Sequence, residues 1–276
     1  MNKWPLVSII VASYNHERYI LTMLESILLD DYENKELIIV NDGSKDNSHQ
    51  IIIEWIEDNK QKIPITYKFR ENKGVCRTLN ELIDLSNGKY LLPIPSDDAL
   101  IPGTIYERVK ILEDNPTKKI LVTDSLVIDE NNEVIMDSSI IDYNGGDKSK
   151  FINDESILQS TLIAPQISGP NILIKKDIYE IVGRSKENLI AEDWYFYQRA
   201  AAKNFMIFKD ITCGKYRVHS NNSSGKAMSG SYKMAWTIVL TYWYNWRLMP
   251  DVEYKLIALK ELSKWFVRYC IYRLKA

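Results

Sequence analysis

The stretch Tyr90-Leu91-Leu92-Pro93-Ile94-Pro95-Ser96-Asp97-Asp98 is an apolar run that follows a turn at Asn87-Gly88 and ends in two adjacent carboxylates. An apolar run of this length between turn signals is typical of a buried strand in a parallel sheet. In open α/β sheets, ligands bind beyond the carboxyl ends of such strands. Adjacent carboxylates repel unless a cation or hydrogen-bond donors hold them. The stretch therefore predicts either a divalent-metal site that carries phosphate oxygens, or a helix N-cap before Pro102.

The chain before this stretch alternates between β-branched runs and amphipathic segments. Strands are predicted at residues 6–12, 36–40, 65–69 and 90–95, with helices at 17–29, 48–58 and 75–85. This alternation predicts an α/β fold whose parallel sheet is wound by right-handed crossovers. After Asp98 the pattern changes to a hairpin at 121–136, a mobile polar loop at 137–150 and short strands at 171–174, 205–208 and 215–218.

Composition limits the classes of function. The 276 residues are enough for one large α/β domain or a domain with an appendage, and the net charge of -2 gives no reason to expect a nucleic-acid partner. The three cysteines form no CxxC pair, which favours a reducing compartment over a disulfide frame or a zinc cluster. No apolar stretch reaches transmembrane length. We therefore expect a cytoplasmic protein.

Six motifs in chain order resemble those of the family 2 glycosyltransferases. They are VSIIVASYN at 7–15, ELIIVNDGS at 36–44, ENKG at 71–74, GKYLLPIPSDD at 88–98, AEDW at 191–194 and YRVH at 216–219. The resemblance spans roughly residues 6–220. It implies the GT-A fold, a Rossmann-like, mixed but mostly parallel sheet flanked by helices. It also implies a nucleotide-diphosphate sugar donor and inversion at the anomeric carbon.

The resemblance places the nucleotide at the ends of the first two predicted strands. Ala12 and Tyr14 match positions that line the nucleobase, and the Tyr14 ring is suited to stack on it. Asp42 matches the acid that hydrogen-bonds the base, much as an acid binds ribose in dinucleotide folds. The structural alternative for Asp42 is a local turn formed by Asp-Gly-Ser.

For the metal, Asp97 matches the last metal-ligating acid of the family, so the resemblance implies Mn²⁺ or Mg²⁺ as cofactor. Pro95 stands where the family commonly has a further acid, which leaves the site one carboxylate short. We therefore expect Asp98 to contact the donor, with a capping role as the alternative. His219, in the Arg-x-His motif, is expected to complete the metal site or contact the diphosphate; a purely structural role is the alternative.

Asp193 matches the general base that takes the proton of the acceptor hydroxyl as an oxocarbenium-like transition state forms. Its structural alternative is to cap the helix predicted at 193–203, and both roles are compatible because a helix N-terminus holds a carboxylate in place. The matched residues thus imply a metal-assisted hexosyltransferase, using a UDP-sugar and a saccharide or lipid-linked saccharide acceptor in polysaccharide biosynthesis. The alternative is a catalytically impaired sugar-nucleotide-binding protein. A dinucleotide-dependent oxidoreductase is disfavoured because no glycine fingerprint follows the first strand.

We divide the chain into a glycosyltransferase domain at 1–220 and a C-terminal helical extension at 221–276. Residues 1–100 form the nucleotide-sugar half of the domain and 101–220 the acceptor half. The extension interleaves aromatic and basic residues. Two interpretations remain open: a basic amphipathic helix resting on an anionic membrane surface, or helices that pack their aromatics against the catalytic domain or a second subunit. The first would make the protein peripheral on the inner face of the membrane, and the second allows a homo-oligomer.

Overall fold

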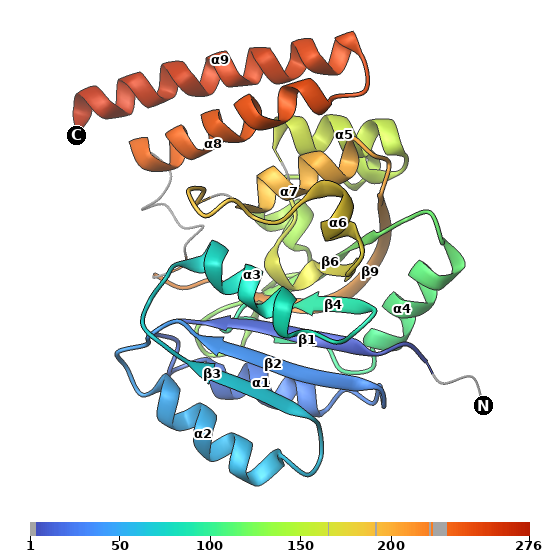
Figure 1. The fold of residues 1–276 in the computed structure, drawn as a ribbon, viewed down its shortest axis with the longest axis vertical. Coiled ribbons are helices and arrows are strands. Elements are labelled where there is room, and N and C mark those ends of the chain that lie inside the picture. Colours follow the sequence, from blue (N-terminus) through green and yellow to red (C-terminus); the bar gives the residue numbers. More distant parts are fainter. Residues whose placement is uncertain (1–3, 165, 191, 221, 223–230) are drawn as a thin grey trace.

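The computed structural model describes residues 4–164, 166–190, 192–220, 222 and 231–276. One mixed sheet runs through these residues in the order β3-β2-β1-β4-β8-β6-β9-β5, and β7 pairs with β6 outside this path (Figure 1). The strands are β1 (Val7–Ser13), β2 (Lys35–Asn41), β3 (Ile65–Phe69), β4 (Tyr90–Pro93), β5 (Ala99–Leu100), β6 (Ile120–Ile128), β7 (Val134–Met136), β8 (Ile172–Lys175) and β9 (Met206–Arg217).

Helices cover both faces of this sheet (Figure 1). The α-helices are α1 (Ile20–Leu28), α2 (Ser48–Asn59), α3 (Val75–Leu85), α4 (Ile105–Asp114), α5 (Asp154–Ile163), α6 (Ile178–Val182), α7 (Glu192–Ala201), α8 (Tyr232–Asn245) and α9 (Val252–Lys275). Shorter helical turns are η1 (Ser139–Tyr143), η2 (Lys148–Phe151), η3 (Gly169–Asn171) and η4 (Trp246–Leu248). The expected α/β fold with C-terminal helices is confirmed.

The first four strands are parallel, as the alternating pattern predicts. Side chains of β1 alternate between the two faces of the sheet: Val7, Ile9 and Val11 belong to one core cluster, and Ile10 to the other. Because both faces are covered, the strand is apolar almost throughout. Ile10 pairs with Pro93 in the adjacent strand, so the chain after β4 leaves the sheet beside the end of β1.

The second half of the sheet differs from the expectation in two places. Residues 206–217 form the single strand β9, where two short strands were predicted, and β9 pairs in parallel with nearly all of β6. Polar residues in the middle of β9 obscure its continuity because sequence patterns report side chains, whereas pairing depends on the backbone. Helix α5, which the sequence analysis did not predict, begins with a capping box formed by Asn153 and Ser156.

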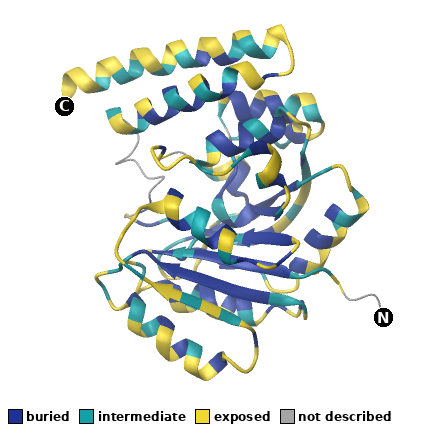
Figure 2. Ribbon diagram, in the orientation of Figure 1, coloured by how far each residue is buried: buried dark blue, intermediate teal, exposed yellow. Residues whose placement is uncertain are grey.

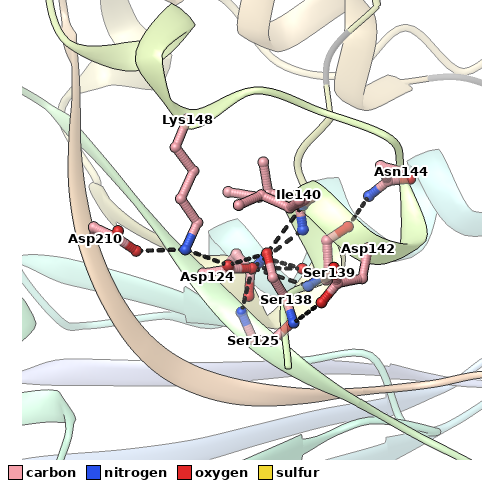
Figure 3. A network of polar contacts seen from close by, with 11 residues as sticks. Asp124, Ser125, Ser138, Ser139, Ile140, Asp142, Asn144, Lys148 and Asp210 are labelled. Atoms are coloured by element: carbon pink, nitrogen blue, oxygen red, sulfur yellow. Dashed lines mark hydrogen bonds and ion pairs between the residues drawn. The ribbon is translucent and has the colours of Figure 1, made fainter. Parts of the chain in front are cut away.

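The segment at 137–150 is anchored rather than a loose loop, which corrects the sequence-based expectation. Figure 3 shows that the buried carboxylate of Asp124, on β6, is the centre of a polar network. Asp124 accepts hydrogen bonds from the hydroxyl groups of Ser138 (2.5 Å) and Ser139 (3.0 Å) and from the Ile140 amide (3.2 Å), and it pairs with Lys148 at 2.9 Å. These contacts hold η1 and η2 against the sheet.

The C-terminal helices α8 and α9 pack as an antiparallel pair beyond α5 and α7 (Figure 1). Several of their aromatic residues face the rest of the fold: Tyr242 is fully buried, and the Trp265 ring lies 6.0 Å from that of Trp194 on α7. The proposed boundary at 220/221 falls beside residues outside the described ranges. Among the helices that the structure describes, none has the length and apolar character required to cross a bilayer.

Candidate active site

A pocket of about 680 Å³ opens at the carboxyl ends of β1, β2 and β4. It contains five residues that the sequence analysis assigned to the site: Ala12, Tyr14, Asp42, Asp97 and Asp193. Parallel strands end at the same edge of a sheet, which explains why segments far apart in the chain meet here. The pocket is therefore the candidate active site.

The loop after β1 turns sharply to aim its side chains at this pocket. Asn15 adopts a left-handed conformation, with φ of 55°, which asparagine tolerates better than most residues. The Asn15 backbone N–H donates a hydrogen bond to Ser44 Oγ at 3.0 Å, and the His16 N–H donates to Ser48 Oγ at 3.0 Å. The loop is thus tied to the one that follows β2, and Tyr14 remains exposed on the pocket wall.

Asp42 holds the loop at 70–74 against the end of β2. Its carboxylate accepts hydrogen bonds from the backbone amides of Lys73 (2.7 Å) and Gly74 (2.9 Å) and from the guanidinium of Arg70. Gly43 is required here, because a Cβ at that position would lie 2.7 Å from the Asn72 nitrogen. A carboxylate has about four acceptor positions, so one remains for a ligand. The Ser44 amide donates to Asn41 Oδ1 at 2.9 Å, so the local turn is capped by Asn41, and Asp42 instead holds the loop at 70–74 with room for a ligand contact.

Asp97, His219 and His16 form a cluster of potential metal ligands. One ligand atom from each lies within 4.8 Å of the others, and no other group of three such residues occurs in the described ranges. His219 Nε2 is 3.0 Å from Asp97 Oδ2, whereas His16 Nδ1 is 3.9 Å from Asp97 Oδ1 and 2.7 Å from the Ser96 hydroxyl. Asp97 and His16 line the pocket, and His219 lies behind them. One carboxylate with two imidazoles suits Mn²⁺ better than Mg²⁺, which prefers oxygen ligands.

The protonation of this cluster also suits a cation. Burial opposes ionisation of Asp97, but the hydrogen bond with His219 and the proximity of His16 outweigh it and lower the pKa of Asp97. Burial lowers the pKa of His16, against the opposing effect of the Asp97 charge. A carboxylate that stays ionised beside an imidazole that stays neutral is the state in which both groups can bind a metal ion. The residues present therefore fit a divalent cation.

Asp98 lies behind the pocket wall instead of lining it. It is 1% exposed, and its Oδ1 accepts a hydrogen bond from the Arg217 backbone amide at 2.8 Å. Its Oδ2 has no hydrogen-bond partner within the part of the chain that the structure describes. Burial and the neighbouring Asp97 charge raise the pKa of Asp98 well above its usual value. The geometry favours a structural role for Asp98 over the donor contact expected from sequence.

Asp193 and Glu192 lie in the first turn of α7 and line the pocket. Asp193 Oδ1 accepts a hydrogen bond from the Trp194 amide at 2.8 Å, which fixes the carboxylate at the helix start. Asp193 is exposed to the pocket's interior, yet enclosure by the surrounding protein raises its pKa. Enclosure and the Asp193 charge raise the pKa of Glu192 to about 8. Ala191, the first residue of this motif, lies outside the described ranges.

Three residues at the site were missed by the sequence analysis. His16 lies in the loop after the first strand, and this placement was its only signal. Glu192 lines the pocket beside Asp193, and its only signal in the sequence is its place in the AEDW motif. Arg70 pairs with Asp42 and Glu81, a role for which the sequence offers no spacing rule. All three depend on contacts between segments that are distant in the chain.

Comparison with known proteins agrees with this geometry. A model of "Glycosyl transferase family 2" matches residues 8–182. The chain belongs to this family. An uncharacterized glycosyltransferase of Haemophilus influenzae is 29% identical over 228 residues, which make up 81% of this chain and 69% of that protein.

Solved structures show the same fold. TarS of S. aureus (residues 1–349) in complex with UDP-GlcNAc superposes with a TM-score of 0.70 and 18% identity, over 95% of this chain and 72% of that one. The mannosyltransferase PcManGT of Pyrobaculum calidifontis, in complex with GDP-Man and Mn²⁺, superposes with a TM-score of 0.68 and 18% identity, over 97% of this chain and 74% of that one. At this identity the likeness establishes the GT-A fold of this glycosyltransferase.

Proposed function

We propose that this glycosyltransferase moves a sugar from a UDP-sugar to a hydroxyl group of a saccharide or lipid-linked saccharide, with inversion at the anomeric carbon. The observation that carries the proposal is the presence of Asp97 and Asp193 on the walls of one pocket. Asp97 belongs to a cluster of three side chains suited to a cation, whereas Asp193 belongs to no such cluster among the described residues. Such a division fits a site that binds a diphosphate at one end and activates an acceptor at the other.

On the donor side, Tyr14 offers an exposed ring for stacking on the nucleobase, and Asp42 has one acceptor position left for an N–H of the base. Ala12 is small enough to leave room beside them. The support for UDP is the UDP-GlcNAc complex of TarS, whereas PcManGT in its complex holds GDP-Man. The nucleobase is therefore the part of the donor that experiment must decide first.

On the acceptor side, Asp193 takes the proton of the acceptor hydroxyl while the hydroxyl oxygen forms its bond to the anomeric carbon. The bond between that carbon and the diphosphate oxygen breaks, and the electron pair leaves with the nucleoside diphosphate. The raised pKa of Asp193 favours this role, because a general base works best when its pKa approaches the working pH. Attack from the face opposite the leaving group inverts the anomeric centre.

Asp97, His219 and His16 would hold the divalent cation, and Mn²⁺ suits this donor set best. When bound, the cation neutralises the negative charge that develops on the departing diphosphate. The protein's own contribution is to keep Asp97 ionised and in place, through the imidazole of His219 and through the Arg217 side chain, whose Nε donates to the Asp97 carbonyl oxygen at 2.6 Å.

A sugar-nucleotide-binding protein without catalysis is the competing function, suggested by Pro95. In the structure Pro95 packs closely on Gly169, where a Cβ would lie 2.3 Å from its ring. The position is thus filled by well-packed apolar atoms, and Asp193 and the metal-ligand cluster are retained. These observations favour the enzyme.

A thermal-shift screen of nucleotides and nucleotide sugars, each with and without Mn²⁺, tests the proposal. A ligand that binds only the native state raises the melting temperature. We expect UDP and UDP-sugars to stabilise the protein in the presence of Mn²⁺. Stabilisation by GDP or GDP-sugars alone would overturn the UDP assignment. Release of UDP from the stabilising sugar nucleotide, measured with acceptor saccharides, then separates an enzyme from a binding protein.

A further inference from the structure

Helix α9 carries a row of exposed apolar side chains along its outer side. Three of them are strongly exposed: Val252 at 70%, Leu256 at 62% and Leu274 at 88%. The spacing of the whole row follows successive helical turns, so its members share one face. We call this row the outer stripe of α9; it comprises Val252, Leu256, Leu259, Phe266, Val267, Cys270 and Leu274, all exposed.

The opposite face of α9 is the one that packs on the protein. Ala258 and Glu261 are buried there, and Trp265 lies against the core beside Trp194. Figure 2 shows α9 as the outermost helix of its end of the molecule, with exposed residues recurring along its length. The aromatic residues of the helix are thus largely accounted for by internal packing, whereas the outer stripe has no covering element among the described residues.

Basic residues flank the outer stripe on both sides. Helical geometry places Lys255 and Arg273 along one edge, and Lys260 and Lys264 along the other. Glu253 is the exposed acid of this helix; Glu261 is buried and pairs with Lys264 at 3.0 Å. A face with an apolar centre and two basic edges therefore runs along a helix of 24 residues, which corresponds to about 36 Å.

This charge pattern distinguishes between two partners for the outer stripe, a second copy of α9 and a phospholipid surface. A second copy of α9, laid against the first in parallel or antiparallel orientation, would bring lysine and arginine edges together, and like charges at such positions oppose pairing. An anionic phospholipid surface complements both parts of the face: the apolar side chains enter the acyl boundary, and the long basic side chains extend to the headgroups. None of the described helices is apolar enough to span the bilayer, so the contact would be interfacial.

We propose that the outer stripe of α9 binds the surface of an anionic phospholipid bilayer, with the helix lying parallel to it. The rest of the protein packs on the other face of α9, so the enzyme would be held at the membrane through this helix. This proposal rests on the exposed face of α9 alone and does not require the donor, the metal or the transfer reaction proposed above.

Flotation of the purified full chain with lipid vesicles tests this proposal. One set of vesicles contains phosphatidylcholine only, and the other contains phosphatidylcholine and phosphatidylglycerol. We expect binding to the anionic vesicles that weakens as salt screens the basic edges. Absence of binding to the anionic vesicles would overturn the proposal, as would equal binding to both sets.

Variants separate the apolar and basic contributions. Leu256→Gln with Val267→Gln should weaken vesicle binding by about tenfold or more, and Lys255→Gln with Lys260→Gln should remove the preference for anionic vesicles. All four side chains lie on the surface or at its edge, so melting temperatures should stay close to that of the wild type. Leu29→Gln is the matched control, because Leu29 is equally apolar, 69% exposed and on another part of the fold.

A second copy of the chain is the competing occupant, and light scattering measures it without lipid. A monomeric wild type supports the membrane assignment. A dimer that the Leu256→Gln/Val267→Gln variant disrupts, together with vesicle binding unchanged in that variant, would assign the outer stripe to self-association and overturn the proposal.

Discussion

Arg217 is bonded to both residues of the acidic pair that ends the stretch after β4. Its backbone amide donates to Oδ1 of Asp98 at 2.8 Å, and its Nε donates to the carbonyl oxygen of Asp97 at 2.6 Å. The end of β9 thereby fixes the turn that presents the Asp97 carboxylate to the pocket. Arg217 is itself fully buried, and its remaining nitrogens donate to the Asp129 carbonyl and to Asn132.

We predict that Asp98 acts on stability more than on donor binding. Asp98→Ala leaves the buried Arg217 amide without its acceptor and should cost about 1–3 kcal/mol of unfolding free energy. Asp98→Asn keeps an acceptor oxygen, so it should cost less and leave donor affinity within about twofold. Denaturant unfolding and donor titration on the same proteins measure both effects. A large loss of donor affinity in Asp98→Asn, with unchanged stability, would instead indicate direct contact with the donor.

Asp193→Asn should abolish transfer while donor binding stays nearly intact, because this carboxylate faces the acceptor. The expected loss of rate is about a hundredfold to ten-thousandfold. Single-turnover transfer and calorimetric donor titration separate the two effects. Glu192→Gln is the matched control, since it removes the neighbouring acid of the same pocket wall and should reduce the rate much less. If Asp193→Asn transfers sugar at the wild-type rate, Asp193 is not the general base and its role is limited to the hydrogen bond at the start of α7.

The metal-ligand cluster predicts linked binding of cation and nucleotide. Asp97→Ala should weaken Mn²⁺ and UDP binding by more than about tenfold, each only when the other is present. His219→Ala should have a smaller effect than Asp97→Ala. Titrations of UDP with and without a chelator provide the measurement.

His16→Ala tests the residue that the structure adds to this cluster. We expect it to weaken Mn²⁺ binding, and His49→Ala is the control, because His49 stacks on Phe69 at 4.3 Å and takes no part in the cluster. If the wild-type protein binds UDP with the same affinity in the presence of chelator as in the presence of Mn²⁺, the metal assignment is wrong for all three residues.

Asp124 predicts a dependence of stability on pH. Burial alone would raise its pKa, but hydrogen bonds from Ser138 and Lys148 outweigh burial and lower the pKa of Asp124 in the folded state. Its stabilising contribution is therefore complete above the unfolded pKa of about 3.9 and is lost as the pH falls through the folded value. Asp124→Asn should cost about 1–3 kcal/mol near neutral pH, because the buried donors of residues 138–140 lose their charged acceptor, whereas Lys148 keeps its ion pair with Asp210.

The difference between wild type and Asp124→Asn should shrink as the pH falls below about 4, where the wild-type carboxyl also becomes neutral. Urea unfolding across this range measures it. Asp137→Asn is the control, because Asp137 is an exposed acid of the same segment. A constant difference at every pH would show that Asp124 acts through its shape rather than its charge.

The sequence by itself determined the parallel half of the sheet and the order of the site motifs. Apolar runs that end in polar residues locate strand ends, and parallel strands bring those ends to one edge. The resemblance to the family motifs then assigned roles at that edge to Tyr14, Asp42 and Asp97. Asp193 was assigned by its resemblance to a family motif, and in the structure it lines the same pocket as the other three residues. The strand and helix positions depend on local periodicity, which the chain encodes directly.

Only the tertiary structure decided which side chains touch. The approach of His16 and His219 to Asp97, the burial of Asp98 beneath Arg217, and the anchoring of residues 137–150 by Asp124 each join segments far apart in the chain. The interleaved aromatic and basic residues of α9 likewise do not reveal which of its faces packs inward. Such contacts depend on how whole elements dock on one another, and the local pattern of apolar and polar residues does not specify that docking.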